Sequence, residues 1–244
     1  MIKKIYIGGH DRGGTTLLAS FVAGIPNSKV LFETPFKFFY ISKNQKSFLK
    51  LKKLCSEYDN PKYFKAFGLK KFPNDKFVYD LFLEKGLVID HTPKNILFKN
   101  EIGNKNTLFI FIIRQLKALY LAHKRVKWGI KSPLKFVIWY HIIKQLALNY
   151  SSENNVELIT FENLLTKQDD ILKLILKKHN LEYTGRKEIG LPDYTKKQHD
   201  KVNKKIDFSK VSAGNYEFSF FEKIILKERI IFKLFSKVFI KLYI

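Results

Sequence analysis

The sequence has little cysteine, few acidic residues and no long uncharged apolar run. Cys55 is the one cysteine among 244 residues, so no disulfide framework can form within the chain, and the composition suits a reducing compartment. Lysines interrupt every apolar run before it reaches about 18 residues, and the apolar stretch near the N-terminus is too short for a secretory signal or a membrane span. We therefore expect a cytoplasmic protein, or one that lies on a membrane surface.

The deficit of acidic residues gives the chain a strong positive charge. Lys and Arg number 45 against 22 Asp and Glu, which is a formal net charge of +23. Such a field attracts polyanions, which include nucleic acid, acidic lipid, an anionic glycan and a multiply phosphorylated cofactor. The lysines are spread along the chain, and no zinc-finger spacing, RNP motif or helix-turn-helix signal accompanies them. We therefore do not expect nucleic acid to be the partner.

Strand and helix signals alternate along the chain. Hydrophobic residues make up 45% and aromatic residues 15% of it, enough for one sizeable core. Five short apolar runs predict buried strands of a parallel sheet, at 5–7, 30–32, 86–90, 108–113 and 156–161. Helical patterns follow three of them, in TTLLASFVAG, QLKALYLAHKRV and LLTKQDDILKLILKKHN. The pattern predicts an α/β protein, a three-layer α/β/α fold with a central parallel sheet.

Three regions lie outside this alternation. We expect residues 1–244 to form a single domain, with a helical insert at about 40–80 that is rich in lysine and aromatic residues. Residues 185–217 contain several Gly, Pro, Asn and Lys residues and predict a loop. The segment at about 218–244 mixes apolar residues with a Lys or Arg every few positions. It predicts a basic amphipathic helix that either docks onto the core or meets anionic lipid.

The segment IYIGGHDRGGTT (5–16) combines a predicted strand, a glycine-rich turn and the start of a helix. Gly9 and Gly14 have the spacing of a P-loop, but Thr15 stands where the lysine of that motif belongs. Backbone N–H groups at a helix N-terminus bind phosphate without a side-chain charge, and the lysine is needed mainly when a γ-phosphoryl group is transferred. The segment therefore predicts either an ordinary glycine turn or a P-loop-like site for a donor whose transferred group is not phosphoryl. The residues of this predicted site are Arg12, Gly13, Gly14, Thr15 and Thr16.

RGGTTLL (12–18) resembles the 5′-phosphosulfate loop of the sulfotransferases that use 3′-phosphoadenosine 5′-phosphosulfate (PAPS). In that family the loop runs from a basic residue through glycine to threonine, straight after the first strand. The second signature of the family is a strand that ends in Arg, followed eight residues later by a helical Ser. FIFIIRQLKALYLAH is similar to it in its strand and in Arg114, and Ala122 takes the place of the serine.

Two later segments follow in the order of the same family. LITFENLL (158–165) looks like the family's strand-to-helix segment, and KVSAGNYEF (210–218) looks like the late loop that closes over the nucleotide. The resemblance thus runs through nearly the whole chain. It implies an enzyme that transfers a sulfuryl group from PAPS to a hydroxyl or amine, without a metal.

The resemblance also implies roles for single residues. Arg12 is expected to contact the 5′-phosphate or the bridging oxygen and so to act in catalysis, and Arg114 is expected to contact the 3′-phosphate. Lys210 and Gly214 are expected to contact the cofactor from the late loop.

Two residues are candidates for the base that removes a proton from the acceptor. Glu33 directly follows the predicted strand at 30–32, where glycan- and protein-modifying members place their catalytic glutamate. His91 lies in a His-x-Pro turn like that of the cytosolic branch, and histidine needs little pKa tuning to act as a base. Because the glutamate-type site resembles the glycan- and protein-modifying branches more, we expect Glu33 as the base and a carbohydrate as the acceptor.

Two other classes of function fit parts of the sequence. A divergent P-loop kinase or NTPase could use Asp90 to hold Mg²⁺, although the missing loop lysine counts against it. A non-catalytic protein on the same fold could use its basic surface to bind nucleic acid or a membrane, and the change to Ala122 fits such a protein.

Overall fold

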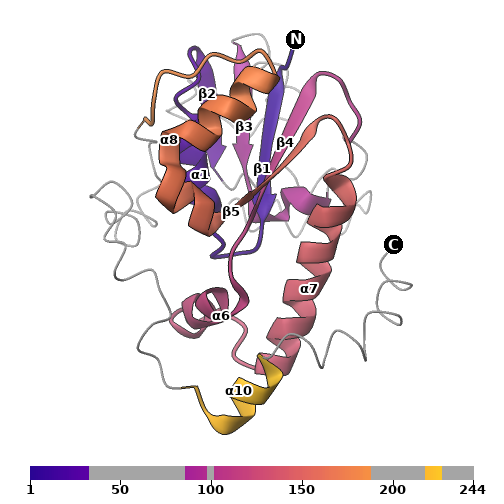
Figure 1. The fold of residues 1–244 in the computed structure, drawn as a ribbon, viewed down its shortest axis with the longest axis vertical. Coiled ribbons are helices and arrows are strands. Elements are labelled where there is room, and N and C mark those ends of the chain that lie inside the picture. The colour runs from indigo at the N-terminus through magenta and orange to yellow at the C-terminus, as the bar shows by residue number, and fades with distance from the viewer. Residues whose placement is uncertain (33–85, 98–101, 188–217, 227–244) are drawn as a thin grey trace, which may run out of the picture.

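The computed structural model describes residues 1–32, 86–97, 102–187 and 218–226 (Figure 1). The strands are β1 (Lys4–Gly9), β2 (Ser28–Phe32), β3 (Leu87–His91), β4 (Thr107–Ile113) and β5 (Val156–Thr160). The helices are α1 (Thr15–Val22), η1 (Pro93–Leu97, a 3₁₀ helix), α6 (Leu116–Lys124), α7 (Pro133–Tyr150), α8 (Phe161–Lys178) and α10 (Phe220–Ile225). All five predicted strands and the three predicted helices within these ranges are therefore confirmed. The predicted helical insert at 40–80 lies outside the described residues.

The five strands form one parallel sheet in the order β2-β3-β1-β4-β5. β1 lies at its centre, with Ile7 opposite His91 of β3 and Ile110 of β4. The chain leaves β1 for β2 on one side and later returns to β4 on the other side. In open α/β sheets, ligands bind beyond the carboxyl ends of the strands at such a change of direction. The loop that follows β1 lies at this place.

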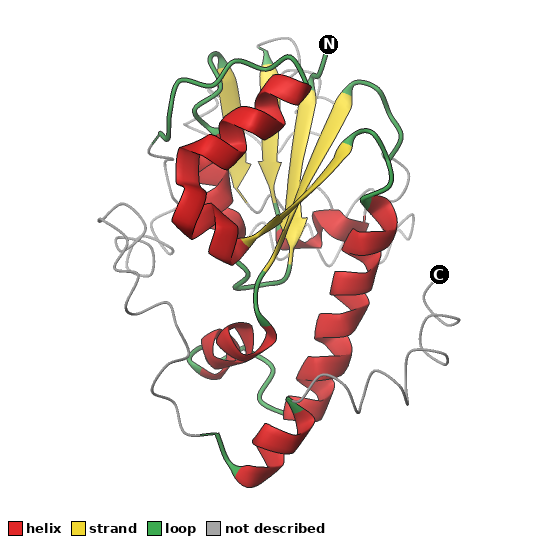
Figure 2. Ribbon diagram, viewed as in Figure 1, coloured by secondary structure: helices red, strands yellow, loops and turns green. Residues whose placement is uncertain are grey.

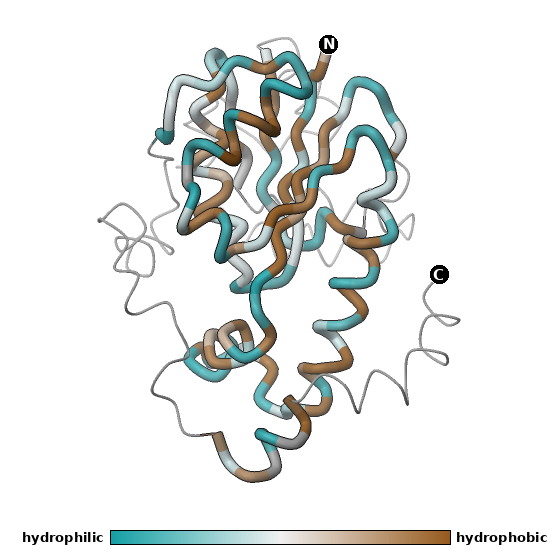
Figure 3. Tube along the Cα trace, viewed as in Figure 1, coloured by the Kyte–Doolittle hydropathy of each residue, from teal (hydrophilic) through white to brown (hydrophobic). Residues whose placement is uncertain are grey.

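The core has two halves, one on each face of the sheet, and β4 contributes to both. Leu108, Ile110 and Ile112 face α1 and α8, whereas Phe109 and Phe111 face α7. Successive side chains of a strand point to opposite faces, so a strand buried on both faces is apolar at every position. Figure 2 shows α1 and α8 on one side of the sheet and α7 on the other, and Figure 3 shows the apolar central strands between them. The three-layer α/β/α fold is confirmed.

The helix α7, which spans 18 residues, is not among the predicted helices. It begins with Ser132 as its N-cap, whose side chain accepts a hydrogen bond from the Lys135 N–H, and with Pro133 in the first turn. Leu134 and Leu148 are 39% and 44% exposed, so its solvent side is not polar enough to give a clear amphipathic pattern. The capping pair Ser132-Pro133 is the signal in the sequence that marks this helix.

Helix α10 is joined to α6 by the buried carboxylate of Glu222, and it packs against α7 through Ile225. Glu222 Oε1 accepts hydrogen bonds from the Tyr120 hydroxyl at 3.0 Å and from Lys124 Nζ at 2.8 Å, and its Oε2 accepts from the Ser219 N–H at 2.9 Å. The Ser219 hydroxyl in turn accepts from the Glu222 N–H, which completes a capping box. These bonds to Lys124 and Ser219 lower the pKa of Glu222 to about 2.

Of the predicted C-terminal helix at 218–244, residues 218–226 are described, and the helical part is α10. Within the described ranges, no helix combines the length and the apolar character needed to cross a bilayer.

Candidate active site

The loop between β1 and α1 has two residues in the left-handed region. Arg12 has φ 64° and Gly14, the N-cap of α1, has φ 104°. The Gly13 N–H donates to the His10 carbonyl at 2.9 Å and closes the turn. The left-handed conformation costs a non-glycine residue such as Arg12 about 1–2 kcal/mol. Strain of this kind at Arg12 is typical of loops that bind a ligand.

The turn brings the first N–H groups of α1 to the carboxyl end of the sheet. No side chain caps this helix, and the first N–H groups of any helix have no acceptor within it. Gly14 is required here because a Cβ at this position would lie 2.3 Å from Cδ2 of Phe161, the first residue of α8. The glycine turn therefore packs directly on an aromatic ring, and uncapped N–H groups at a helix N-terminus such as this one are suited to binding an anion.

Arg114, the residue that follows β4, lies against the same turn. Its Nη1 donates to the Arg12 carbonyl at 3.3 Å, and its guanidinium lies 4.4 Å from the centre of the Phe161 ring. Burial lowers the pKa of Arg114 to about 10, with Arg12 and Arg125 adding repulsion and Glu162 opposing it. The side chain remains protonated at pH 7. Arginines gathered in this way repel one another, so an anion placed among them would be stabilised.

His91 and Thr16 meet beside the loop. His91 is fully buried at the end of β3, and its Nε2 lies 3.4 Å from the Thr16 hydroxyl. In P-loop NTPases the hydroxyl at the position of Thr16 binds Mg²⁺. Thr15, at the position of the P-loop lysine, is 4% exposed. Thr15 thus departs from the phosphoryl-transfer motif, whereas Thr16 matches it in residue type and contacts His91.

The sequence alone indicates no role for two loop residues, His10 and Asp11. His10 is fully buried against α7, where its Nε2 lies 3.0 Å from the Tyr140 carbonyl. The Asp11 carbonyl lies 2.9 Å from Nε2 of His123, a residue of α6. His123 is the residue next to Ala122, where the family resemblance expects a contact to phosphate. In this structure His123 instead contacts the backbone of the loop.

The predicted site residues fall into two groups. Seven of them lie together at the carboxyl edge of the sheet, namely Arg12, Gly13, Gly14, Thr15, Thr16, His91 and Arg114. Glu33, Lys210 and Gly214 lie outside the described residues. In the part of the chain that the structure describes, no group of three or more His, Cys, Asp or Glu side chains could hold a metal ion.

The described residues form a P-loop-like α/β fold with a glycine turn and an uncapped helix N-terminus at the start of α1. Three solved sulfotransferases share its fold. A sulfotransferase domain from the curacin biosynthetic pathway is 14% identical, with a TM-score of 0.52 over 92% of this chain and 95% of that one. A sulfotransferase domain from the olefin synthase of Synechococcus PCC 7002 is 16% identical, with a TM-score of 0.53 over 93% of each chain.

A sulfotransferase from Alicyclobacillus acidocaldarius is 10% identical, with a TM-score of 0.50 over 81% of this chain and 89% of that one. A scan against known protein families finds no match, and a search of curated protein sequences finds none either. At sequence identities of 10–16%, these comparisons show a shared fold. The chain therefore has the fold of the sulfotransferases, as the sequence resemblance predicted.

Proposed function

We propose that this protein is a sulfotransferase that uses PAPS. The observation that carries the proposal is the glycine turn at the start of α1, flanked by Arg12 and Arg114, with buried Thr15 in place of the P-loop lysine. Backbone N–H groups and two guanidinium groups together suit the phosphate groups of a nucleotide. A divergent kinase is disfavoured because Thr16, the residue that would hold Mg²⁺, contacts His91.

The residues of the loop fit this cofactor. A Cβ at Gly13 would approach the His10 carbonyl and a Cβ at Gly14 would approach the Phe161 ring, so both glycines are needed for the turn to keep its shape. Arg12 and the N–H groups of α1 would hold the 5′-phosphate, and Arg114 would hold the 3′-phosphate. Bound PAPS supplies the activated sulfuryl group. Arg12 and the N–H groups of α1 would then stabilise the charge that grows on the bridging oxygen, and no metal is proposed.

We propose that Glu33 is the catalytic base and that the acceptor is a carbohydrate. Glu33 directly follows β2, whose last residue Phe32 pairs with His91 in the sheet, so β2 ends at the same carboxyl edge as the loop. His91 is a weaker candidate because it is fully buried and contacts Thr16. We infer that His91 orients the Thr16 hydroxyl. A net charge of +23 would also favour an anionic glycan.

Adenosine 3′,5′-bisphosphate, the desulfated cofactor, should raise the melting temperature of the protein without magnesium. A ligand at a hundredfold excess over its Kd stabilises the folded state by about 2.7 kcal/mol, which is roughly 5–10 °C for a chain of this size. ATP should have little effect, even with magnesium. Differential scanning fluorimetry measures both shifts, and stabilisation by ATP that depends on magnesium would favour the kinase instead.

Arg114→Ala should remove most of the rise in melting temperature that adenosine 3′,5′-bisphosphate causes. The loss of a charge-assisted hydrogen bond to the 3′-phosphate weakens binding by about 1.5–3 kcal/mol, which is about 10- to 150-fold in Kd. Lys173→Ala is the matched control, because it removes one positive charge from an exposed position of α8. Equal affinity of the two variants would show that Arg114 does not contact the cofactor.

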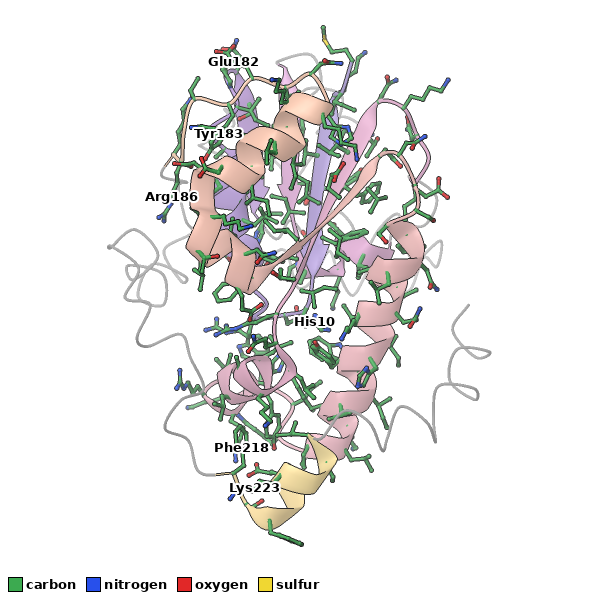
Figure 4. The ribbon with its side chains drawn as sticks, viewed as in Figure 1. His10, Glu182, Tyr183, Arg186, Phe218 and Lys223 are labelled. Atoms are coloured by element: carbon green, nitrogen blue, oxygen red, sulfur yellow. The ribbon has the colours of Figure 1, made fainter. Side chains whose placement is uncertain are left out.

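We also propose that the end of the molecule formed by α10 and the α6–α7 turn contacts anionic lipid. Figure 1 places these elements beyond the carboxyl edge of the sheet. Phe220 and Trp128 are 79% and 62% exposed there. Lys223, labelled in Figure 4, is exposed on α10. Exposed aromatic residues beside lysines suit the interface of an anionic membrane.

The protein should therefore sediment with vesicles that contain phosphatidylserine, and less with vesicles of phosphatidylcholine alone. Phe220→Ser should weaken binding about 10- to 150-fold, since burial of the ring contributes about 1.5–3 kcal/mol. Leu174→Ser is the control, because Leu174 is 71% exposed on α8. Equal sedimentation with both kinds of vesicle, or equal effects of the two variants, would show that this surface does not bind anionic lipid.

A further inference from the structure

Two buried histidines hold the phosphate loop from the side of α6 and α7. His123 Nε2 lies 2.9 Å from the Asp11 carbonyl, and His10 Nε2 lies 3.0 Å from the Tyr140 carbonyl. These contacts fix two successive loop residues to two different helices. Figure 4 shows His10 beside α7, below the end of the sheet. The contacts lie directly before Arg12, so they set where Arg12 and the glycine turn begin.

The two hydrogen bonds define the protonation state of each ring. The Ile130 N–H donates to His123 Nδ1 at 3.3 Å, so Nδ1 carries no proton and Nε2 donates to Asp11. His10 donates from Nε2 to the Tyr140 carbonyl, and its Nδ1 has no hydrogen-bond partner among the described residues. A proton added to His123 would point at the Ile130 N–H. A proton added to His10 would be buried without an acceptor, so both rings are suited to the neutral form.

Aromatic packing holds the two rings in these orientations. Trp139 contacts both of them edge-on, with ring centres 4.9 Å from His10 and 5.0 Å from His123. Tyr140 stacks on His10 at 4.8 Å, and Phe136 lies 5.1 Å from His123. The two histidines and Trp139 thus form one packed unit. A shift of either ring would be transmitted to the other through the indole.

Burial and the neighbouring positive charges both lower the pKa values of the two histidines. Burial lowers the pKa of His10 to about 4, and the charges of His123, Lys144 and His141 add to this, while the Tyr140 carbonyl opposes it. Burial also lowers the pKa of His123, as do the charges of Arg12 and Lys131, while Asp11 raises it. Both rings are therefore neutral at pH 7.

We propose that His10 and His123 are positioning residues that fix the phosphate loop in its binding conformation through their neutral imidazoles. The inference rests on the proposed function for its ligand, although the contacts themselves do not depend on any ligand. The depressed pKa values mean that the neutral form is the one the folded state favours. The contribution of the two rings to the stability of the loop is therefore complete above about pH 6.5, the ordinary pKa of histidine, and is lost as the pH falls from there through their lowered pKa values.

The test compares His123→Phe with His123→Gln. Phenylalanine keeps the packing on Trp139 but loses both nitrogens, whereas glutamine keeps a donor for the Asp11 carbonyl and does not titrate. His179→Gln is the control, because His179 contacts Glu157 at the far end of α8. Hydrogen–deuterium exchange of residues 10–16 without ligand, and titration with adenosine 3′,5′-bisphosphate from pH 8 to pH 4.5, are measured for each protein.

In His123→Phe we expect the loop amides to exchange about 3- to 10-fold faster, the size of one net hydrogen bond, with exchange of β4 unchanged. Affinity should fall by a similar factor and should be restored in His123→Gln. As the pH falls, the wild type should lose affinity more steeply than His123→Gln. This comparison cancels the titration of the ligand phosphates, whose second pKa is about 6.

Unchanged loop exchange in His123→Phe, or parallel pH profiles of the wild type and His123→Gln, would overturn the inference. If the wild type does not bind the nucleotide at all, the proposed cofactor is wrong. In that case faster loop exchange in His123→Phe would still support the positioning role.

Discussion

Replacing Gly14 with alanine should destabilise the fold and lower the rate of sulfuryl transfer about 100-fold or more. The new Cβ would lie 2.3 Å from the Phe161 ring, at a residue with φ 104°. The left-handed backbone costs about 1–2 kcal/mol and the overpacking about 1–3 kcal/mol, so the free energy of unfolding should fall by about 2–5 kcal/mol. Displacement of the first turn of α1 would also misplace the cofactor, and small misplacements cost about 100-fold in rate.

Gly185→Ala is the matched control for this variant. Gly185 also has φ 104°, but a Cβ there would meet none of the described residues within 4 Å. It should lose about 1–2 kcal/mol from strain alone and keep its activity. Urea unfolding and kcat/KM measure the two effects. If the two variants lost equal stability and activity, the contact between the loop and Phe161 would not matter, and the proposed cradle would be wrong.

Glu33→Gln should lower kcat about 10²- to 10⁴-fold, the usual contribution of a general base, while cofactor affinity barely changes. Glutamine keeps the size of the side chain and removes its basicity. His91→Asn should cost less, since its expected effect is to release the Thr16 hydroxyl, which lies 3.4 Å away. The assay is the transfer of labelled sulfate from PAPS to a panel of sugars, with other hydroxyl and amine acceptors beside them.

The two variants separate three outcomes. A fully active Glu33→Gln with an inactive His91→Asn would make His91 the base, as in the cytosolic branch of the family. If neither substitution matters in an active enzyme, the base is another residue. Activity that is confined to acceptors other than sugars would leave the base assignment intact but would contradict the carbohydrate acceptor.

The fold was predictable where local pattern and burial agree. The strand at 108–113 is apolar at every position because both of its faces are covered, and the segment 15–24 has a clear helix stop. Helix α7 was missed because Leu134 and Leu148 are exposed, which hides the spacing of its buried side chains. Patterns along a sequence report burial, and they fail where exposed residues are also apolar.

The site was predictable where one short segment contains the whole feature. In the turn at 12–16, Gly14 has φ 104° and a Cβ at Gly13 would meet the His10 carbonyl, so the motif itself carries the signal. His10 and His123 could not be assigned, because the role of each depends on a partner more than 100 residues away. Each is an ordinary histidine in the sequence. A contact of this kind becomes visible when the fold brings the two segments together.

The distant contacts of the loop also determine when it can form during synthesis. The hydrogen bond of His10 requires Tyr140, which is synthesised 130 positions later. The hydrogen bond to the Asp11 carbonyl requires His123, 112 positions later. β1 itself has no neighbouring strand in the sheet until Leu87 and Thr107 have been made. Chains grow from the N-terminus, and pairings between distant segments form late. We therefore expect a nascent chain that stops before Pro133 to contain the complete glycine motif without its contact to Tyr140, and the proposed nucleotide site to form only once α7 has left the ribosome.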